Sequence, residues 1–197
     1  MSSEKDGSGK DTAAFMLKDY IKSFGMITSV FTFATPVINA YVQIFDEQRF
    51  DFYKLDRSKR EKLLSFSAGC KSVDPDVFIK KTCQALRKQI NEHFIAYGTD
   101  VEIFFIFTDA RYQYEVDRVL EVLSAASKEL DVSANLSVLH IDKKDVASKP
   151  LSDREGEFET IDLARHYVST IDNNGTLEEL EDKVKSYFLE RLNNEQG

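Results

Sequence analysis

The chain has 197 residues and carries 26 Lys and Arg against 34 Asp and Glu, a net charge of -8 that disfavours non-specific binding to nucleic acid. Hydrophobic residues make up 42% of it, including 15 Phe and 8 Tyr, which is enough for a packed core and too much for a disordered chain. The two Cys and three His match no zinc or disulfide spacing, and no apolar run is long enough to span a bilayer. We therefore expect one cytoplasmic domain over residues 1–197 that binds neither nucleic acid nor a membrane. The composition leaves a homodimer open.

Helical and strand patterns alternate along the chain. The expected elements, in order, are helix 11–24, strand 26–34, helix 36–45, helix 57–69, helix 74–93, strand 101–108, helix 114–130, strand 136–141, strand 167–171 and helix 176–192. Gly25 ends the first helix, and Asp74-Pro75 reads as an N-cap followed by proline at the first helical position. Thr176 and Glu179 have the spacing of a capping box.

The run 101–108 (VEIFFIFT) is the most apolar part of the sequence. Both of its faces are apolar, which is typical of a central strand in a parallel sheet. Strands that alternate with helices predict an α/β fold with a mostly parallel sheet and right-handed crossovers. Residues 142–160 are polar and irregular, which predicts a mobile, lid-like loop.

The segment from Gly7 to Thr12 (GSGKDT) has the residue types of a phosphate-binding loop. Glycines let backbone N–H groups close around phosphate oxygens, Lys10 supplies a positive charge, and the helix that follows points its N-terminus at the anion. The full pattern G-x-x-x-x-G-K-[ST] is not met, because Glu4 stands at its first glycine and Asp11 at its last position. The alternative is a flexible, charged N-terminus that leads into a helix.

Thr108, Asp109 and Arg111 follow the most apolar strand. Ligands of open α/β sheets bind at the carboxyl ends of the strands, where an acid can hold Mg²⁺ and an Arg can reach phosphate. Alternatively, Asp109 caps the next helix and Arg111 pairs with Glu115 on the surface.

A third candidate segment, 71–78, follows a basic helix, and basic side chains cluster at 54–62 and 80–88. Arg and Lys grip phosphate oxygens, so these clusters could recognise a small phosphorylated ligand. They could equally be solvated helix faces, and 71–78 could be only a helix start with an anchoring Phe.

The order of these segments resembles the deoxynucleoside monophosphate kinase family of phages and bacteria and, more distantly, the animal-type phosphomevalonate kinases. The matching segments run over nearly the whole chain: Ser8-Gly9-Lys10-Asp11-Thr12, Phe33-Ala34-Thr35-Pro36, Asp74-Pro75-Asp76-Val77-Phe78, Thr108-Asp109-Ala110-Arg111-Tyr112-Gln113-Tyr114-Glu115, and Asn173-Asn174-Gly175-Thr176-Leu177-Glu178-Glu179-Leu180. The resemblance implies a P-loop kinase-like, three-layer α/β fold. It also implies ATP and Mg²⁺ as cofactors and a small substrate that bears a phosphate.

The resemblance also implies roles for individual residues. Lys10, Asp109 and Arg111 would be catalytic. The ATP-binding residues would be Gly7, Ser8, Gly9, Lys10, Asp11, Thr12 and, beside the adenine, Asn173. Asp11, Thr12 and Asp109 would lie near the metal. The acceptor would be bound by Arg57, Arg60, Asp74, Arg111 and, from the lid, Arg154.

The chain departs from the family before the loop, where the family has an apolar strand and this sequence has only residues 1–6. A sheet without its middle strand would leave backbone groups of the neighbouring strands unpaired. The leading expectation is therefore ATP-dependent phosphoryl transfer to a nucleoside or deoxynucleoside monophosphate. The alternatives are a phosphomevalonate kinase-like enzyme, and a degenerate or truncated kinase fold that binds nucleotide without catalysis.

Overall fold

The computed structural model describes residues 1, 8–45, 57–99, 101–144, 161–165 and 167–195. Its elements, in chain order, are α1 (Lys10–Ser23), β1 (Ile27–Phe31), α2 (Thr35–Phe45), α3 (Arg57–Val73), α4 (Val77–Tyr97), β2 (Ile103–Phe107), α5 (Gln113–Leu130), β3 (Val138–Asp142), β4 (Val168–Asp172) and α6 (Leu177–Glu195). Each expected helix and strand is present, so the chain has a mixed α/β fold. The predicted lid at 142–160 falls mostly on 145–160, which lies outside the described residues.

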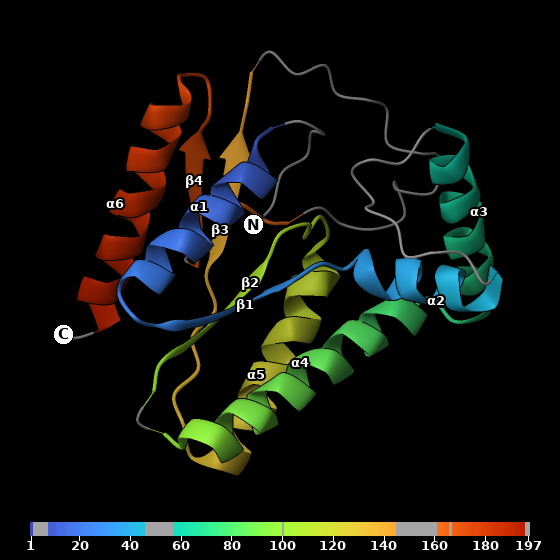
Figure 1. Cartoon of the computed structure of the whole chain (residues 1–197), viewed down its shortest axis with the longest axis horizontal. Helices are drawn as coiled ribbons and strands as arrows, with labels where there is room; N and C mark the ends of the chain where they lie inside the picture. Colours follow the sequence, from blue (N-terminus) through green and yellow to red (C-terminus); the bar gives the residue numbers. More distant parts are fainter. Residues whose placement is uncertain (2–7, 46–56, 100, 145–160, 166, 196–197) are drawn as a thin grey trace.

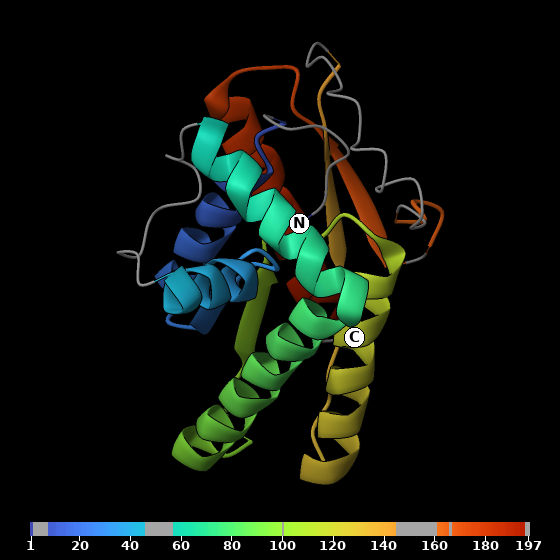
Figure 2. The same cartoon turned by 90° about the vertical axis from the view of Figure 1, so that its right-hand side faces the viewer.

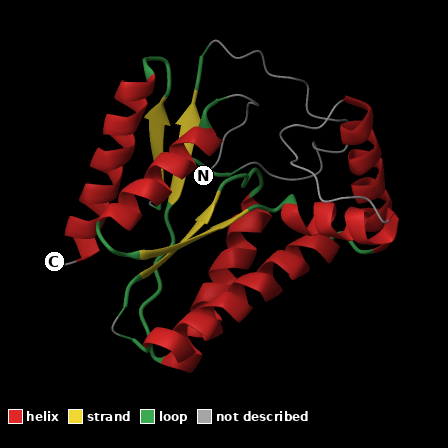
Figure 3. Cartoon of the chain, viewed as in Figure 1, coloured by secondary structure: helices red, strands yellow, loops and turns green. Residues whose placement is uncertain are grey.

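The strands form two separate parallel pairs instead of one sheet. β1 pairs with β2 in the register Ile27 to Ile103, and β3 pairs with β4 in the register Val138 to Val168. Figure 3 shows the four strands in the middle of the fold with helices outside them. The expectation of parallel strands is confirmed, whereas the expectation of a single sheet needs correction, because no described strand joins β2 to β3.

The helices gather in three groups around the strands (Figure 1). α1 packs against α6 beside β3 and β4, and α4 packs against α5. Figure 2 shows α4 and α5 running side by side, with α3 crossing the upper part of the molecule. α2 and α3 form the third group, to one side of the strands.

The largest core cluster lies between α1, α6 and the strands. It contains Ala13, Ala14, Ile21, Ile106, Leu139, Ile141, Ile171, Leu180, Val184 and Phe188, together with Met1. The α6 residues recur at four-residue intervals, and on α1 the partly buried Leu17 and Tyr20 fill the spacing between Ala13, Ala14 and Ile21, so each helix turns one apolar face inward. Phe188 packs edge-on against Tyr20, Phe24 and Phe104, with ring centroids 5.6, 5.8 and 5.6 Å away. This cluster fixes where α1 begins relative to the strand ends.

Two helix boundaries show how local chemistry sets the fold. Gly25 has φ +76° after α1 and donates its N–H to the carbonyl of Lys22, as expected of a helix stop. The expected start of α4 at Asp74-Pro75 is wrong by a few residues, since α4 begins at Val77. The Asp74 carboxylate accepts the N–H of Asp76 (3.1 Å), and this local turn holds Pro75 outside the helix.

No helix in the described ranges is both long enough and apolar enough to cross a membrane.

Candidate functional site

The loop Ser8-Gly9-Lys10 leads directly into α1 and is held by the far end of the chain. Asn173 lies just beyond β4 and donates its side-chain amide to the carbonyl oxygen of Ser8 (2.7 Å). Gly9 has φ +92°, a conformation that favours glycine, and a Cβ placed on it would come within 2.3 Å of Asn173 Nδ2. The loop therefore needs glycine at this position both for its backbone angle and for the approach of Asn173.

Asn173 is itself fixed by its neighbours. Its backbone N–H donates to the carbonyl of Asp142 at the end of β3 (2.7 Å). Just downstream, Glu179 N–H donates to Thr176 Oγ1 (3.2 Å) and Thr176 N–H donates to the Glu179 carboxylate (3.3 Å). This confirms the predicted capping box at the start of α6. The turn that presents Asn173 thus lies between two well-anchored elements.

Lys10 is buried in the first turn of α1, with 8% of its surface exposed. Its ammonium lies 3.6 Å from the carboxylate of the adjacent Asp11, which is half-buried. Thr12 is exposed on the same turn. A buried Lys at the N-terminus of a helix brings a cation and the positive end of the helix dipole to one place, and both attract an anion.

Asp109 follows β2 and reaches across to the chain that follows β1. Its carboxylate accepts hydrogen bonds from the backbone N–H groups of Phe33 (2.7 Å) and Ala34 (3.1 Å). Burial raises the pKa of Asp109 above its usual value, while these two hydrogen bonds and the charges of Lys10 and Arg111 act in the opposite direction. Asp109 therefore shares one electrostatic environment with Lys10 and Arg111, and it does not cap α5.

Glu115, one turn into α5, caps that helix. Its carboxylate accepts the backbone N–H groups of Arg111 (2.8 Å) and Tyr112 (3.1 Å). Its pKa is raised to about 7, chiefly by burial and to a smaller extent by the charge of Asp109, while these hydrogen bonds and the charge of Lys71 act in the opposite direction. The backbone of Arg111 is therefore held by a carboxyl that titrates near neutral pH.

Two hydroxyls near these residues are buried and have no hydrogen-bond partner in the described part of the chain. They are Ser8 Oγ, in the loop, and Thr108 Oγ1, at the end of β2. Buried polar groups are seldom left unsatisfied, and such groups often mark a place for a water, an ion or a ligand.

Of the residues predicted to bind an acceptor, the structure places only Arg111, among the described residues, in the electrostatic environment of Asp109 and Lys10. The Asp74 carboxylate pairs with Lys80 (2.8 Å), and that hydrogen-bonded ammonium lowers the pKa of Asp74. Arg60 and the backbone of Arg57 belong to α3, which lies well to the side of α1 in Figure 1. Gly7 and Arg154 lie outside the described residues, and the side chain of Arg57 is not described.

The structure thus brings Ser8, Gly9 and Lys10 together with Asn173, and sets Asp109 and Arg111 in the same electrostatic environment. Sequence reasoning missed that the backbone of Phe33 and Ala34 anchors Asp109. The available signal was that both segments directly follow strands, and the carboxyl ends of parallel strands meet at one edge. The central position of Glu115 was also missed, although its spacing from Tyr112 fits the acid of a helix cap.

The described residues contain no group of three or more His, Cys, Asp or Glu side chains placed to hold a metal. A Mg²⁺ ion bound with a nucleotide does not need such a group, because it usually takes one or two carboxylates and completes its shell with phosphates and water. Asp109 uses one lone pair on each carboxylate oxygen for the Phe33 and Ala34 N–H groups, which leaves further acceptor capacity. The site thus fits one carboxylate contact to such an ion.

In comparisons with known proteins, the chain matches no protein-family model and no curated protein.

Proposed function

We propose that the protein transfers a phosphoryl group from ATP to a nucleoside or deoxynucleoside monophosphate. The observation that carries this proposal is the Gly9-Lys10 turn, a left-handed glycine and a buried lysine at a helix start, whose charge lowers the pKa of the nearby buried carboxyl of Asp109. Glycine clears the space that a side chain would fill, and Lys10 supplies a cation for phosphate oxygens. The buried hydroxyl of Ser8 adds a polar group that lacks a described partner.

In this proposal each residue acts through position and charge, since phosphoryl transfer needs little covalent chemistry from the protein. Mg²⁺, when bound with ATP, neutralises phosphate charge. Lys10 and the loop backbone would hold the ATP phosphates, and Asp109 would offer a carboxylate to the metal or its water ligands. Arg111 offsets charge on the transferring group, and Glu115 positions the backbone of Arg111.

The test must also distinguish two alternative functions. A phosphomevalonate kinase-like enzyme would use the same loop with another acceptor. A degenerate kinase fold would bind ATP without transferring phosphate. A specific observation favours that second alternative, because the strands behind the loop form two separate pairs.

The test is an ATP·Mg²⁺ assay with a panel of deoxynucleoside monophosphates, nucleoside monophosphates and phosphomevalonate, together with ATP binding by calorimetry. Lys10→Met keeps the apolar stem and removes the charge, and the matched control is Lys22→Met, at the exposed end of the same helix. We expect Lys10→Met to lower kcat/KM by about 100-fold or more and Lys22→Met to leave it unchanged.

Each outcome separates the alternatives. Turnover of phosphomevalonate alone would reject the nucleotide acceptor, and ATP binding without turnover of any acceptor would indicate the non-catalytic fold. Equal ATP affinity and turnover in the parent protein and Lys10→Met would reject the phosphate-loop interpretation altogether.

A further inference from the structure

Gln113, the first residue of α5, is a buried polar residue next to the candidate site. Its side chain is 6% exposed, and it stands two residues after Arg111 and two before Glu115, whose carboxylate holds the Arg111 backbone. The side-chain amide of Gln113 makes three hydrogen bonds. Nε2 donates to Asp117 Oδ1 (2.7 Å) and to the Tyr167 hydroxyl (3.0 Å), and Oε1 accepts the backbone N–H of Asp162 (3.2 Å).

These partners determine which way the amide faces. Exchange of its oxygen and nitrogen would set an NH2 group against the Asp162 N–H and a carbonyl oxygen against the Asp117 carboxylate, so both bonds would be lost. Asp162 and Tyr167 follow Gln113 by 49 and 54 residues, so the amide makes a tertiary contact and not a local helix cap. The surroundings therefore require both the donors and the acceptor of a glutamine at this position.

Asp162 and Tyr167 belong to the segment that leads into β4, which is described over 161–165 and at Tyr167 and is called the pre-β4 segment below. Within it, the Asp162 carboxylate accepts the N–H of Ala164 (3.0 Å). Val138, at the start of β3, donates its N–H to the carbonyl of Tyr167 (2.8 Å). The pre-β4 segment is thus held by its own bonds and by β3, and Gln113 bonds to both of its ends.

The pre-β4 segment also packs on the start of α5. Ile161 is 7% exposed. It belongs to a buried cluster that includes Ala110, Val116 and Val138. Ala110 lies in the sequence between Asp109 and Arg111. Apolar contact and the Gln113 amide therefore hold the pre-β4 segment on the same short stretch that carries these two residues.

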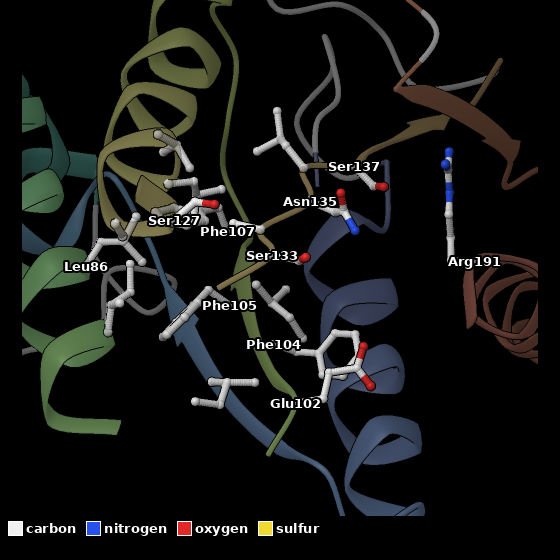
Figure 4. A pocket seen from close by; sticks show the side chains of 18 of the residues that line it. Leu86, Glu102, Phe104, Phe105, Phe107, Ser127, Ser133, Asn135, Ser137 and Arg191 are labelled. Carbon is white, nitrogen blue, oxygen red and sulfur yellow. The ribbon is translucent and has the colours of Figure 1, made fainter. Parts of the chain in front are cut away.

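The start of α5 also borders a cavity of about 860 Å³ that is lined in part by Ala110, Glu115 and Val116. Figure 4 shows other residues of its wall, among them Leu86 of α4 and Phe107 of β2. A wall that faces a cavity makes fewer van der Waals contacts than a close-packed one. Directional bonds from other elements therefore contribute more to the position of the start of α5 than they would in a fully packed core.

The pre-β4 segment continues through β4 to Asn173, whose side-chain amide donates to the Ser8 carbonyl (2.7 Å). One strand thus runs from the partners of Gln113 to the phosphate-binding loop. We propose that Gln113 is a positioning residue, which holds the pre-β4 segment on the start of α5 and so sets the place of Arg111 relative to the loop Ser8-Gly9-Lys10. Its effect on turnover rests on the phosphoryl transfer proposed above, whereas its effect on the pre-β4 segment does not.

The variants separate the hydrogen bonds of Gln113 from its size. Gln113→Met keeps a similar volume and removes all three bonds, and the matched control is Gln84→Met at an exposed position of α4. Gln113→Glu alone sets a carboxylate against that of Asp117. The double variant, Gln113→Glu with Asp117→Asn, exchanges donor and acceptor between the two positions, so their bond can form again. The Asp162 N–H keeps its acceptor in that variant, and the Tyr167 hydroxyl can donate.

Amide hydrogen exchange of the full chain is measured by NMR at Asp162, Arg111 and Tyr112, with the β1 amides as an internal reference. For Gln113→Met we expect exchange at these three amides to be faster by about tenfold or more, and exchange in β1 to change by less than about twofold. The difference separates a local release from a general loss of stability. The double variant should stay within about threefold of the parent protein, and Gln84→Met should match the parent.

Turnover is measured in the same proteins with ATP·Mg²⁺ and a mixture of deoxynucleoside monophosphates. We expect Gln113→Met to lower kcat by about tenfold or more and to change the KM for ATP by less than about twofold, because a displaced Arg111 affects the transition state more than ATP binding. The double variant should recover kcat to within about threefold of the parent value. A role in stability alone would lower the free energy of unfolding and leave kcat unchanged.

Three results would overturn the proposal. Unchanged exchange at Asp162 in Gln113→Met would show that the amide does not hold the pre-β4 segment. Faster exchange at Asp162 with unchanged exchange at Arg111 would show that the segment does not position Arg111. Equal effects in Gln113→Met and in the double variant would assign the change to altered packing instead of hydrogen bonds. If the parent protein transfers phosphate to no acceptor, the proposed function fails, and the exchange rates alone decide the role of Gln113.

Discussion

Substitution of Gly9 by Ala measures how tightly the loop is held, because it adds a backbone conformational cost and displaces the Asn173 amide from Ser8. The residue has φ +92°, where an L-amino acid costs about 1–2 kcal/mol. The new Cβ would also lie 2.3 Å from Asn173 Nδ2, so the amide must move and give up its hydrogen bond to Ser8. That bond contributes about 0.5–1.5 kcal/mol.

Gly25→Ala is the matched control. Gly25 has φ +76°, and a Cβ added there meets nothing within 4 Å, so only the backbone cost applies. In both variants Ala also lowers the conformational entropy of the unfolded chain, and this offsets about 0.4–1 kcal/mol of the loss in stability. We therefore expect Gly25→Ala to lower the free energy of unfolding by about 1 kcal/mol or less, and Gly9→Ala to lower it by about 2 kcal/mol.

The assay is equilibrium urea unfolding followed by circular dichroism, extended to Asn173→Ala and the double variant. In the double variant the clash is absent and the hydrogen bond is already lost, so the total cost should fall below the sum of the single costs by about 1 kcal/mol. The reasoning is refuted if Gly9→Ala costs no more than Gly25→Ala, or if the Gly9 and Asn173 costs simply add.

Three further predictions concern the site and the core. The pKa of Glu115 is raised to about 7 in the folded protein, so its contribution to stability is fully present below about pH 4.5 and is lost as pH rises through about 7. Glu115→Gln should therefore remove up to about 3 kcal/mol of this pH dependence. Identical profiles of urea midpoint against pH for the two proteins would contradict the prediction. Asp109→Asn should lower the free energy of unfolding by about 1–3 kcal/mol, because only the oxygen of an amide, and not its NH2 group, can accept from the Phe33 and Ala34 N–H groups. The control is Asp19→Asn at an exposed position of α1. Equal costs in the two variants would show that the Asp109 hydrogen bonds contribute nothing to stability. Phe188→Ala should lower the free energy of unfolding by about 3–5 kcal/mol, because the ring is 3% exposed and packs among three aromatic neighbours. Leu189→Ala, at a residue that is 40% exposed, should lower it by less than about 1 kcal/mol. Similar melting temperatures for the two variants would contradict this description of the core.

The local elements were largely predictable. The helix that ends before Gly25 and the capping box of Thr176 and Glu179 are as expected, because each depends on groups a few residues apart. The start of α4 was misplaced because Asp74 and Pro75 fit a helix cap and a tight turn almost equally well. The hydrogen bond from Asp76 N–H to the Asp74 side chain decided in favour of the turn.

The candidate site was predictable in its residue types but not in its contacts. Lys10, Asp109 and Asn173 were singled out from the sequence, whereas the bonds of Asp109 to the Phe33 and Ala34 backbone were not expected. Phe33 and Ala34 precede Asp109 by 76 and 75 residues in the sequence, and no local sequence pattern indicates such a pairing. The raised pKa of Glu115 likewise depends on burial, which only packing creates.

By itself, the sequence determined the alternation of helices and parallel strands, the glycine-lysine turn at the start of α1 and the apolar character of β2. Only the tertiary structure decided that the strands form two pairs with a cavity between them, and that Asn173 closes over Gly9. The physical reason lies in the range of the hydrogen bonds. Helices and caps satisfy their backbone groups within about four residues, so local sequence specifies them. The backbone N–H and C=O groups along a strand edge bond only to a strand that is distant in the sequence, so the tertiary structure decides which strand that is.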